Sequence, residues 1–260
     1  MIRSIIINSC LLKVMNHMNL TKSVTALSIF CLLIIAAGVV FHAQADHKSG
    51  IVIILNGASA SGKSTLQKEV QKLYSTPYLG IGLDTFFVGV LPQRFIIGPR
   101  QEGDIDAQQV LMGSPGADEQ GNKLFTLSIG PVGDQVMHGM HHAIAAYAWQ
   151  ANNCIVDYIA YKKEWIPDLC SALKGLKVYL VGVDCALEIL ENREKARGRA
   201  AVEGHARSHY KTVHEMMDNQ YDVRVDTGTT DAATCAKTIV DFIATHPDPK
   251  AFKNVMHGLK

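Results

Sequence analysis

The residues Gly57–Thr65 carry the pattern G-x-x-x-x-G-K-S/T, which is typical of a loop that binds the phosphates of a nucleoside triphosphate. Two glycines let the backbone N–H groups approach phosphate oxygens, and the start of the following helix favours an anion. Lys63 is expected to reach the β- and γ-phosphates, and the Ser64 hydroxyl to hold Mg²⁺. The predicted nucleotide-binding residues are Gly57, Ala58, Ser59, Ala60, Ser61, Gly62, Lys63, Ser64 and Thr65.

The segments on either side of this loop give the pattern its meaning. Residues 51–55 form a continuous apolar run rich in β-branched side chains, as expected of a buried parallel strand. After the loop, Leu66, Val70 and Leu73 recur at helical spacing. A chance glycine loop that merely opens a helix is the alternative, but strand, loop and helix in this order favour a nucleotide site.

Two aspartates follow other strand-like segments. Asp84 comes after the predicted strand 78–83, and Asp157 after the predicted strand 154–156. Ligands of open α/β sheets bind beyond the carboxyl ends of the strands, so both carboxylates are expected beside the loop. Asp84 is expected to accept the proton of an acceptor hydroxyl, and Asp157 to assist Mg²⁺ as a Walker-B aspartate. The alternative for each is a turn or capping aspartate.

Arg193 and Arg197 are four residues apart and would share one face of a predicted helix over 185–200. A Gly- and Ala-rich joint over 198–204 follows them and could let an arginine-bearing lid close over a triphosphate. Both arginines are therefore candidate catalytic residues. The alternative is a solvated helix face, which the Glu191/Lys195 pair at i,i+4 would also suit.

Alternating strand-like and helix-like segments predict an α/β fold with a parallel sheet. Two further strands are expected at 177–183 and 221–225, and helices at 133–150, 164–174, 206–217 and 231–245. Asp184 is placed to cap the N-terminus of the helix that follows it. Residues 86–132 show weak periodicity and many prolines and glycines, so we expect a long loop that shapes the acceptor pocket or an insertion with no role.

The first 45 residues read as a leader that precedes a domain over 46–260. They contain three basic and no acidic residues, an apolar run over 24–41, and an A-x-A sequence ending at Ala45. This pattern predicts an export signal cleaved after Ala45, with an uncleaved membrane anchor through 24–41 as the alternative. Either would place the domain outside the cytoplasm, periplasmic or secreted. A net charge of +1 gives no case for a nucleic-acid partner.

The cysteines and histidines show no metal-binding spacing. An even number of cysteines after the leader permits disulfides in an exported protein but assigns none: Cys154, Cys170, Cys185 and Cys235. His138 and His142 share a helix face, yet no third ligand or H-E-x-x-H order accompanies them. We interpret them as surface or pocket-lining residues.

From about residue 51 to the end, the chain resembles the chloramphenicol phosphotransferases. The resemblance covers 55–57 with 62–64, 80–84, 128–131, 181–183, 193–198, 213–215, 221–223 and 225–227. It implies a shikimate-kinase-like P-loop fold with a five-stranded parallel sheet, and ATP-dependent phosphorylation of a small-molecule hydroxyl. It also implies Asp84 as the base and Arg193 and Arg197 as lid arginines.

The identity of the acceptor is left open, because residues 86–121 match that family poorly. Two other functional classes compete with a small-molecule kinase. One is a nucleotide-binding ATPase that acts as a switch, which would not need an acceptor base at Asp84. The other is an exported interaction module without catalysis, against which intact Lys63, Ser64 and Asp157 argue.

Overall fold

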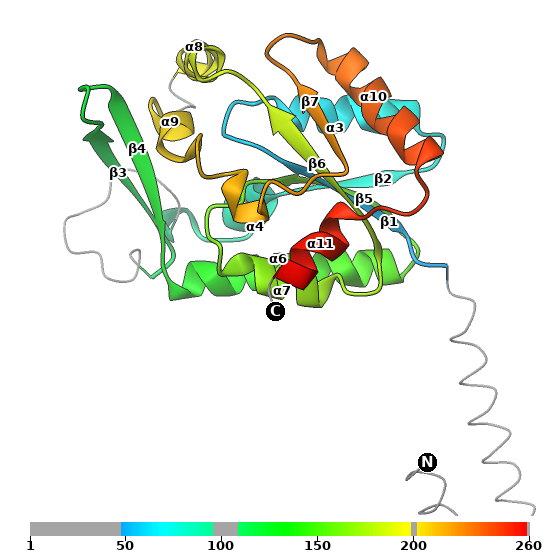
Figure 1. The fold of residues 1–260 in the computed structure, drawn as a ribbon. Coiled ribbons are helices and arrows are strands. Elements are labelled where there is room, and N and C mark those ends of the chain that lie inside the picture. Colours follow the sequence, from blue (N-terminus) through cyan, green and yellow to red (C-terminus); the bar gives the residue numbers. More distant parts are fainter. Residues whose placement is uncertain (1–47, 96–108, 199–201, 259–260) are drawn as a thin grey trace, which may run out of the picture. The chain divides into compact units, whose positions relative to one another are not determined.

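Five parallel strands form the central sheet of this protein, whose computed structural model describes residues 48–95, 109–198 and 202–258 (Figure 1). Their order across the sheet is β2-β5-β1-β6-β7. The connection from β1 to β2 runs to one side of β1, and the connection from β5 to β6 crosses to the other side. Such a change of direction opens a crevice at the carboxyl ends of the strands. The strands are β1 Ile51–Asn56, β2 Tyr78–Gly82, β5 Asn153–Tyr158, β6 Lys177–Asp184 and β7 Val223–Asp226.

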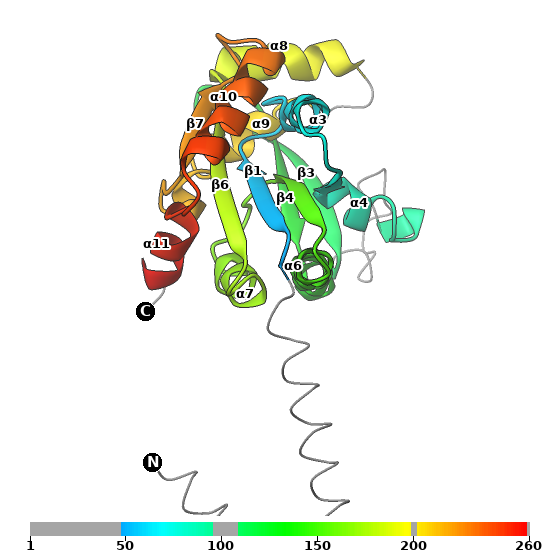
Figure 2. The ribbon, with the colours of Figure 1, turned by 90° about the vertical axis from the view of Figure 1, so that its right-hand side faces the viewer.

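Helices cover both faces of this sheet (Figures 1 and 2). Successive side chains of a strand point to opposite faces, and β1 shows the result. Val52 and Ile54 join one apolar core, whereas Ile53 and Leu55 join the other, and all four are fully buried. The helices are α6 Pro131–Trp149, α7 Trp165–Ala172 and α11 Ala251–Gly258 at the first core, and α3 Lys63–Leu73 and α10 Ala232–Thr245 at the second.

A two-stranded antiparallel hairpin, β3 Leu111–Ala117 and β4 Lys123–Ile129, stands apart from the central sheet. The prediction of a long loop over 86–132 is therefore wrong for this part. Pro115 and two glycines conceal β3, because such residues weaken the strand pattern. A Cβ at Gly113 would come within 2.1 Å of the end of the Phe125 ring across the hairpin, so a larger residue there would force that ring to move. Residues 96–108 lie outside the described part.

Short helices complete the rim around the carboxyl ends of the strands. They are α4 Leu83–Phe87, α8 Leu187–Arg197, α9 His205–His209, and the 3-10 turns Gln93–Phe95 and Glu215–Met217. The predicted helix over 206–217 is thus wrong, because α9 ends at His209 and only a turn of 3-10 helix follows. α11 was not predicted.

The predicted cap at Asp184 is also wrong. Ala186 precedes α8 without a side-chain cap, and Asp184 instead accepts hydrogen bonds from Arg224 on β7, at 2.9 Å from Nε. The last strand begins at Val223, so its start lies two residues beyond the predicted one. The predicted helices over 133–150, 164–174 and 231–245 are confirmed within a few residues at each end.

Residues 1–47, which include the predicted leader and its apolar run, lie outside the described part of the chain. Within residues 48–95, 109–198 and 202–258, no helix has both the length and the apolar character needed to cross a bilayer. Cleavage after Ala45 and export stay predictions.

Candidate active site

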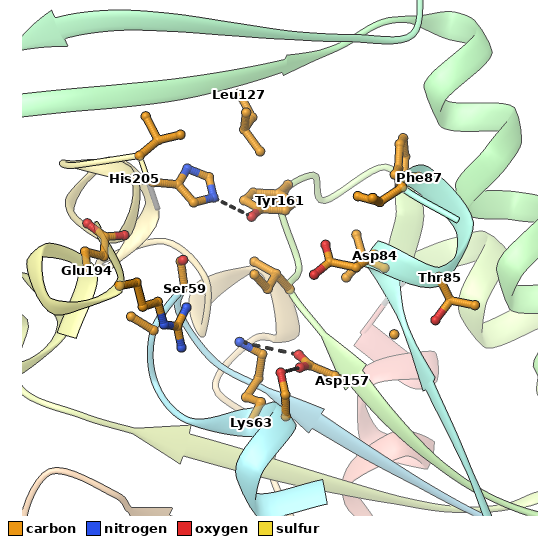
Figure 3. Close-up of a pocket in the computed structure, with 18 of the residues that line it drawn as sticks. Ser59, Lys63, Asp84, Thr85, Phe87, Leu127, Asp157, Tyr161, Glu194 and His205 are labelled. Atoms are coloured by element: carbon orange, nitrogen blue, oxygen red, sulfur yellow. Dashed lines mark hydrogen bonds and ion pairs between the residues drawn. The ribbon is translucent and has the colours of Figure 1, made fainter. Parts of the chain in front are cut away.

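A cavity of about 440 Å³ lies at the carboxyl ends of β1, β2 and β5. The phosphate loop, α4, the hairpin and the ends of α8 and α9 all contribute side chains to its lining. Figure 3 shows Lys63 and Asp157 at one end, Leu127 at the other, and Asp84 between them. The cavity therefore joins the predicted nucleotide site to the hairpin.

Lys63 is held inside the phosphate loop. Its Nζ donates to the backbone oxygen of Ala58 at 2.8 Å and lies 3.6 Å from a carboxylate oxygen of Asp157. The side chain is only 5% exposed, and burial lowers the pKa of Lys63, although the neighbouring Asp157 carboxylate acts in the opposite direction. A mostly desolvated amine with one ionic partner on the described chain fits a site for anionic phosphate.

The backbone of the loop has the conformation that its glycines predict. Gly62 has φ 85°, in the left-handed region that favours glycine, and directly precedes α3. At Gly57 a Cβ would come within 2.4 Å of the backbone oxygen of Val183 on β6. Both positions therefore exclude larger side chains, and the loop can present its N–H groups at the start of α3.

Ser64 and Asp157 meet at the foot of the cavity. The Ser64 hydroxyl donates to Asp157 Oδ2 at 2.5 Å (Figure 3). Asp157 lies within β5 rather than after it, one residue before the last of the strand. A hydroxyl and a carboxylate oxygen side by side are the donor types that Mg²⁺ takes, so these two residues fit a magnesium site.

Asp84 lies in the first turn of α4, directly after β2, and lines the cavity. Its side chain is exposed into the cavity, yet protein atoms surround it on several sides. Partial desolvation raises the pKa of Asp84, and the nearby Asp157 carboxylate raises it further, while Lys63 and Arg197 oppose the shift. A carboxylate of raised pKa in a cavity is suited to taking a proton.

The two predicted lid arginines have different surroundings. Arg197 is exposed and lines the cavity. Arg193 lies against the phosphate loop, where it donates to the backbone oxygens of Ala60 at 3.3 Å and Thr227 at 2.6 Å. The Thr227 hydroxyl in turn donates to the backbone oxygen of Ser61 at 2.6 Å. Arg193 thus braces the loop, and residues 199–201 of the predicted joint lie outside the described part.

Two residues that the sequence did not single out hold the phosphate loop in place. Asn56, fully buried at the end of β1, donates to the backbone oxygen of Val213 and accepts from the backbone N–H of Ala160. His209 Nε2 accepts from the backbone N–H of Ser59 at 3.0 Å. Burial lowers the pKa of His209 to about 3, with His205 adding to the effect, so its ring stays neutral and able to accept. The sequence signal available for Asn56 was a polar residue at the end of an apolar strand, because a buried polar group needs hydrogen-bond partners.

The half of the cavity away from the loop is mostly apolar. Its side chains come from the hairpin and from α4: Phe87, Leu111, Phe125, Leu127 and Ile129. Tyr161 and His205 supply neutral polar groups among them (Figure 3). These apolar residues all lie within 86–132, the segment that was expected to shape the acceptor pocket. Its secondary structure, a short helix and a hairpin, was not predicted.

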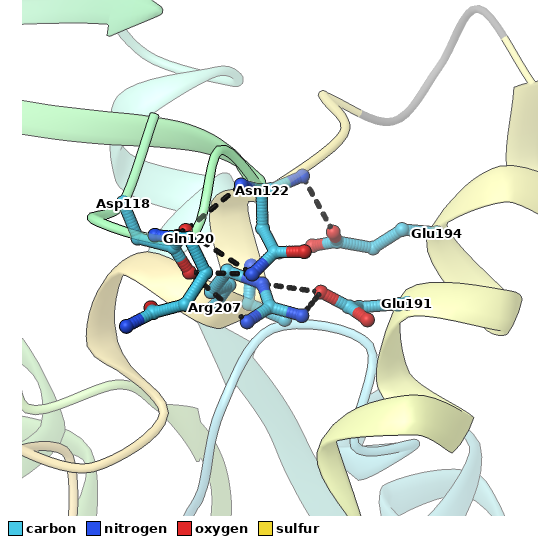
Figure 4. Close-up of polar contacts among 8 residues, drawn as sticks. Asp118, Gln120, Asn122, Glu191, Glu194 and Arg207 are labelled. Atoms are coloured by element: carbon cyan, nitrogen blue, oxygen red, sulfur yellow. Dashed lines mark hydrogen bonds and ion pairs between the residues drawn. The ribbon is translucent and has the colours of Figure 1, made fainter. Parts of the chain in front are cut away.

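Polar contacts fasten the hairpin to α8 (Figure 4). Arg207 donates to Glu191 of α8 at 2.6 Å and to Asp118, at the turn of the hairpin, at 3.2 Å. The buried carboxylate of Glu194 accepts the backbone N–H groups of Gly204, at 3.1 Å, and Ala206, at 2.7 Å. α8, α9 and the hairpin are therefore joined on one side of the cavity.

The remaining candidates stay outside this site. No group of three or more potential metal-ligating side chains of histidine, cysteine or acidic type is present within the described ranges. His141, next to the two surface histidines, is fully buried and bonded to Asp168 and Tyr158. All four cysteines of the described part are buried free thiols: Cys154, Cys170, Cys185 and Cys235.

Residues 50–244 match the sequence profile of the family described as "Chloramphenicol phosphotransferase-like protein". The chain belongs to this family. Two Mycobacterium tuberculosis proteins, from strains CDC 1551 and H37Rv, are both named "Putative O-phosphotransferase". Each is 28% identical to this chain over 213 residues, which is 82% of this chain and 91% of the relative.

Two solved structures share the fold. A sugar kinase from Janibacter has a TM-score of 0.52 and 16% identity, covering 76% of this chain and 95% of its own. The Mycobacterium tuberculosis APS kinase CysC, in complex with AMPPNP and APS, has a TM-score of 0.50 and 15% identity, covering 75% and 98%. The predicted α/β fold class is confirmed: a P-loop kinase fold with a five-stranded parallel sheet. Family and fold together support a phosphotransferase.

Proposed function

We propose that this protein transfers the γ-phosphoryl group of ATP to a hydroxyl of a small molecule. The observation that carries the proposal is the single cavity that joins Lys63, Ser64 and Asp157 to Asp84. A nucleotide-binding switch would need only Lys63, Ser64 and Asp157. The raised pKa of Asp84, farther along the same cavity, suits a carboxylate that takes the proton of an acceptor hydroxyl.

In the proposed reaction, Asp84 accepts the proton of the acceptor hydroxyl as that oxygen bonds to the γ-phosphorus. The bond between this phosphorus and the bridging oxygen to the β-phosphate breaks, and ADP leaves with the electron pair. Proton acceptance by a positioned carboxylate supplies about a hundredfold or more in rate. The position of Asp84, between the phosphate loop and the apolar half of the cavity, suits an acceptor that enters from the hairpin side.

Lys63 and Arg197 are proposed to stabilise the negative charge on the transferring group, since both line the cavity. Ser64 and Asp157 are proposed to hold Mg²⁺, which would neutralise charge on the β- and γ-phosphate oxygens when bound. Arg193 is proposed to act indirectly, by keeping the carbonyl groups of Ala60 and Thr227 in place.

The test is a screen of hydroxyl-bearing small molecules, chloramphenicol included, with ATP and Mg²⁺, followed by the Asp84→Asn variant. We expect phosphorylated product from the wild type, and for Asp84→Asn a kcat lower by about a hundredfold or more with unchanged nucleotide affinity. Asp241→Asn, an exposed aspartate on α10, is the matched control. ATP hydrolysis without any phosphorylated acceptor would favour the switch function instead.

The pH profile gives a second readout of the same assignment. A general base works only when deprotonated, so kcat/KM should fall as the pH drops through the raised pKa of Asp84. This acidic limb should therefore lie at higher pH than the ordinary pKa of an aspartate would give, and should disappear in Asp84→Asn. An unchanged acidic limb in that variant would assign the limb to another group.

A further inference from the structure

Tyr161 and His205 form a hydrogen-bonded pair on the wall of the cavity. Tyr161 follows β5, and His205 begins α9, so the pair links the central sheet to the hairpin side. Tyr161 Oη lies 2.8 Å from His205 Nε2, and both side chains line the cavity with part of their surface exposed (Figure 3). Neither residue has a part in the proposed phosphoryl transfer.

The second nitrogen of His205 determines which way the proton between the pair points. Nδ1 of His205 lies 3.2 Å from the backbone oxygen of Phe125 on β4. A carbonyl oxygen can only accept, so Nδ1 carries a hydrogen and donates. Burial lowers the pKa of His205, which keeps the ring neutral and leaves Nε2 without a hydrogen. Nε2 must therefore accept, and the Tyr161 hydroxyl donates to it.

Tyr161 Oη is left with lone pairs and no free hydrogen. Within the described residues it has no hydrogen bond other than the one to His205. A phenol oxygen keeps two acceptor lone pairs after its hydrogen is used, so it can still take one hydrogen bond from a ligand. Because its hydrogen is committed, it cannot donate one without breaking the contact with His205.

We propose that Tyr161 determines acceptor specificity by accepting a hydrogen bond from a second donor group on the acceptor molecule. This inference rests on the proposed function. Leu127, Phe125 and Phe87 line the same half of the cavity, so the body of the molecule is apolar. The preferred acceptor is then a largely apolar compound with the hydroxyl that is phosphorylated at Asp84 and a further hydroxyl or amide N–H that meets Tyr161.

A pair of synthetic probes tests the direction of this hydrogen bond. 2-Phenyl-1,3-propanediol carries a second hydroxyl, whereas its mono-methyl ether, 3-methoxy-2-phenylpropan-1-ol, keeps the oxygen and loses the donor. The wild type should phosphorylate the diol with a kcat/KM about tenfold above that of the ether, the effect of one hydrogen bond and one unsatisfied partner. Equal kcat/KM values for the two probes would overturn the inference.

Two variants separate recognition from a structural role. Tyr161→Phe should lower kcat/KM for the diol by about tenfold and leave the ether unchanged, so that the preference disappears. His205→Leu frees the Tyr161 hydrogen to donate to an ether oxygen, so the ether should improve toward the diol. Nucleotide affinity should stay at the wild-type value in both. A general packing defect would instead lower turnover of both probes equally, and a retained tenfold preference in Tyr161→Phe would refute the assignment.

Failure of this inference is distinguishable from failure of the proposed function. If other hydroxyl compounds of the screen are phosphorylated and neither probe is, the inferred acceptor class is wrong while the kinase function stands. If no compound in the screen is phosphorylated by the wild type, the proposed function itself is wrong.

Discussion

The phosphate loop and the β3–β4 hairpin face the same cavity but are stabilised in different ways. The loop lies between buried strands, and Lys63, Arg193 and Asn56 fasten its backbone through hydrogen bonds to fixed carbonyl and amide groups. The hairpin pairs only with itself as a sheet. Its base packs into the first apolar core through Leu111 and Ile129, and its outer part contacts α9 and makes exposed or half-buried ion pairs. The position of the loop is thus fixed by the core, whereas the position of the outer part of the hairpin, at Asp118 and Lys123, depends on polar contacts that solvent can weaken.

The largest expected effect comes from removing the positive charge of Lys63 at the phosphate loop. Lys63→Ala should lower turnover by about a thousandfold, since a preorganised charge at the transferring group is lost. Nucleotide affinity should fall with it, and isothermal titration of ATP with Mg²⁺ would measure this. Lys68→Ala is the control, because this exposed residue of the same helix has no hydrogen bond or ion pair with the described part of the chain. Unchanged nucleotide binding in Lys63→Ala would show that the loop is not the nucleotide site.

A second test separates the two arginines of α8. Arg197→Ala should lower kcat by about a hundredfold with little change in the melting temperature, because it removes charge at the cavity. Arg193→Ala should lower the free energy of unfolding by about 2 kcal/mol, the cost of losing charge-assisted hydrogen bonds to carbonyls in the interior. Thermal unfolding and steady-state kinetics would be measured on both. Equal kcat losses at full stability would restore the paired catalytic role that the sequence predicts.

The smallest expected effect is on the hairpin side. Arg207→Ala removes the contacts that join Asp118 to Glu191, so the hairpin wall should become less well positioned. We expect the acceptor KM to rise about fivefold with the nucleotide KM unchanged, within the range of coupling that such networks carry. Lys123→Ala breaks a more exposed ion pair with Glu203 and is the matched control, with little expected change. A rise in the nucleotide KM would show that the position of the hairpin also affects the phosphate loop.

The same difference explains what the sequence could predict. Local patterns specify the loop: a β-branched apolar run, glycines that need open space, and a lysine directly before a helix. These gave the fold class, the sheet and the positions of Lys63, Ser64 and Asp157. Asp84 was placed correctly at the cavity, although in a short helix rather than at the tip of the strand.

Long-range contacts specify the rest, and a local pattern does not reveal them. β3 contains Pro115 and two glycines and pairs only with β4, so its strand character depends on its partner. Tyr161 and His205 are 44 positions apart in sequence and meet only after α9 folds against the hairpin. Arg193 and Arg197 share a spacing that suggests one role, yet neighbouring carbonyl groups from Ala60 and Thr227 give the first a different one.

The attachment of the hairpin has an evolutionary consequence. The hairpin is inserted between α4 and α6. None of its residues takes part in the pairing of β2 with β5 or of β5 with β1. Substitutions in the outer part of the hairpin, away from the buried Leu111 and Ile129, can therefore accumulate without disturbing the two apolar cores. Under the proposed function, a lineage with this arrangement would exchange one acceptor for another by drift in this segment, while the residues that handle the phosphoryl group are inherited intact.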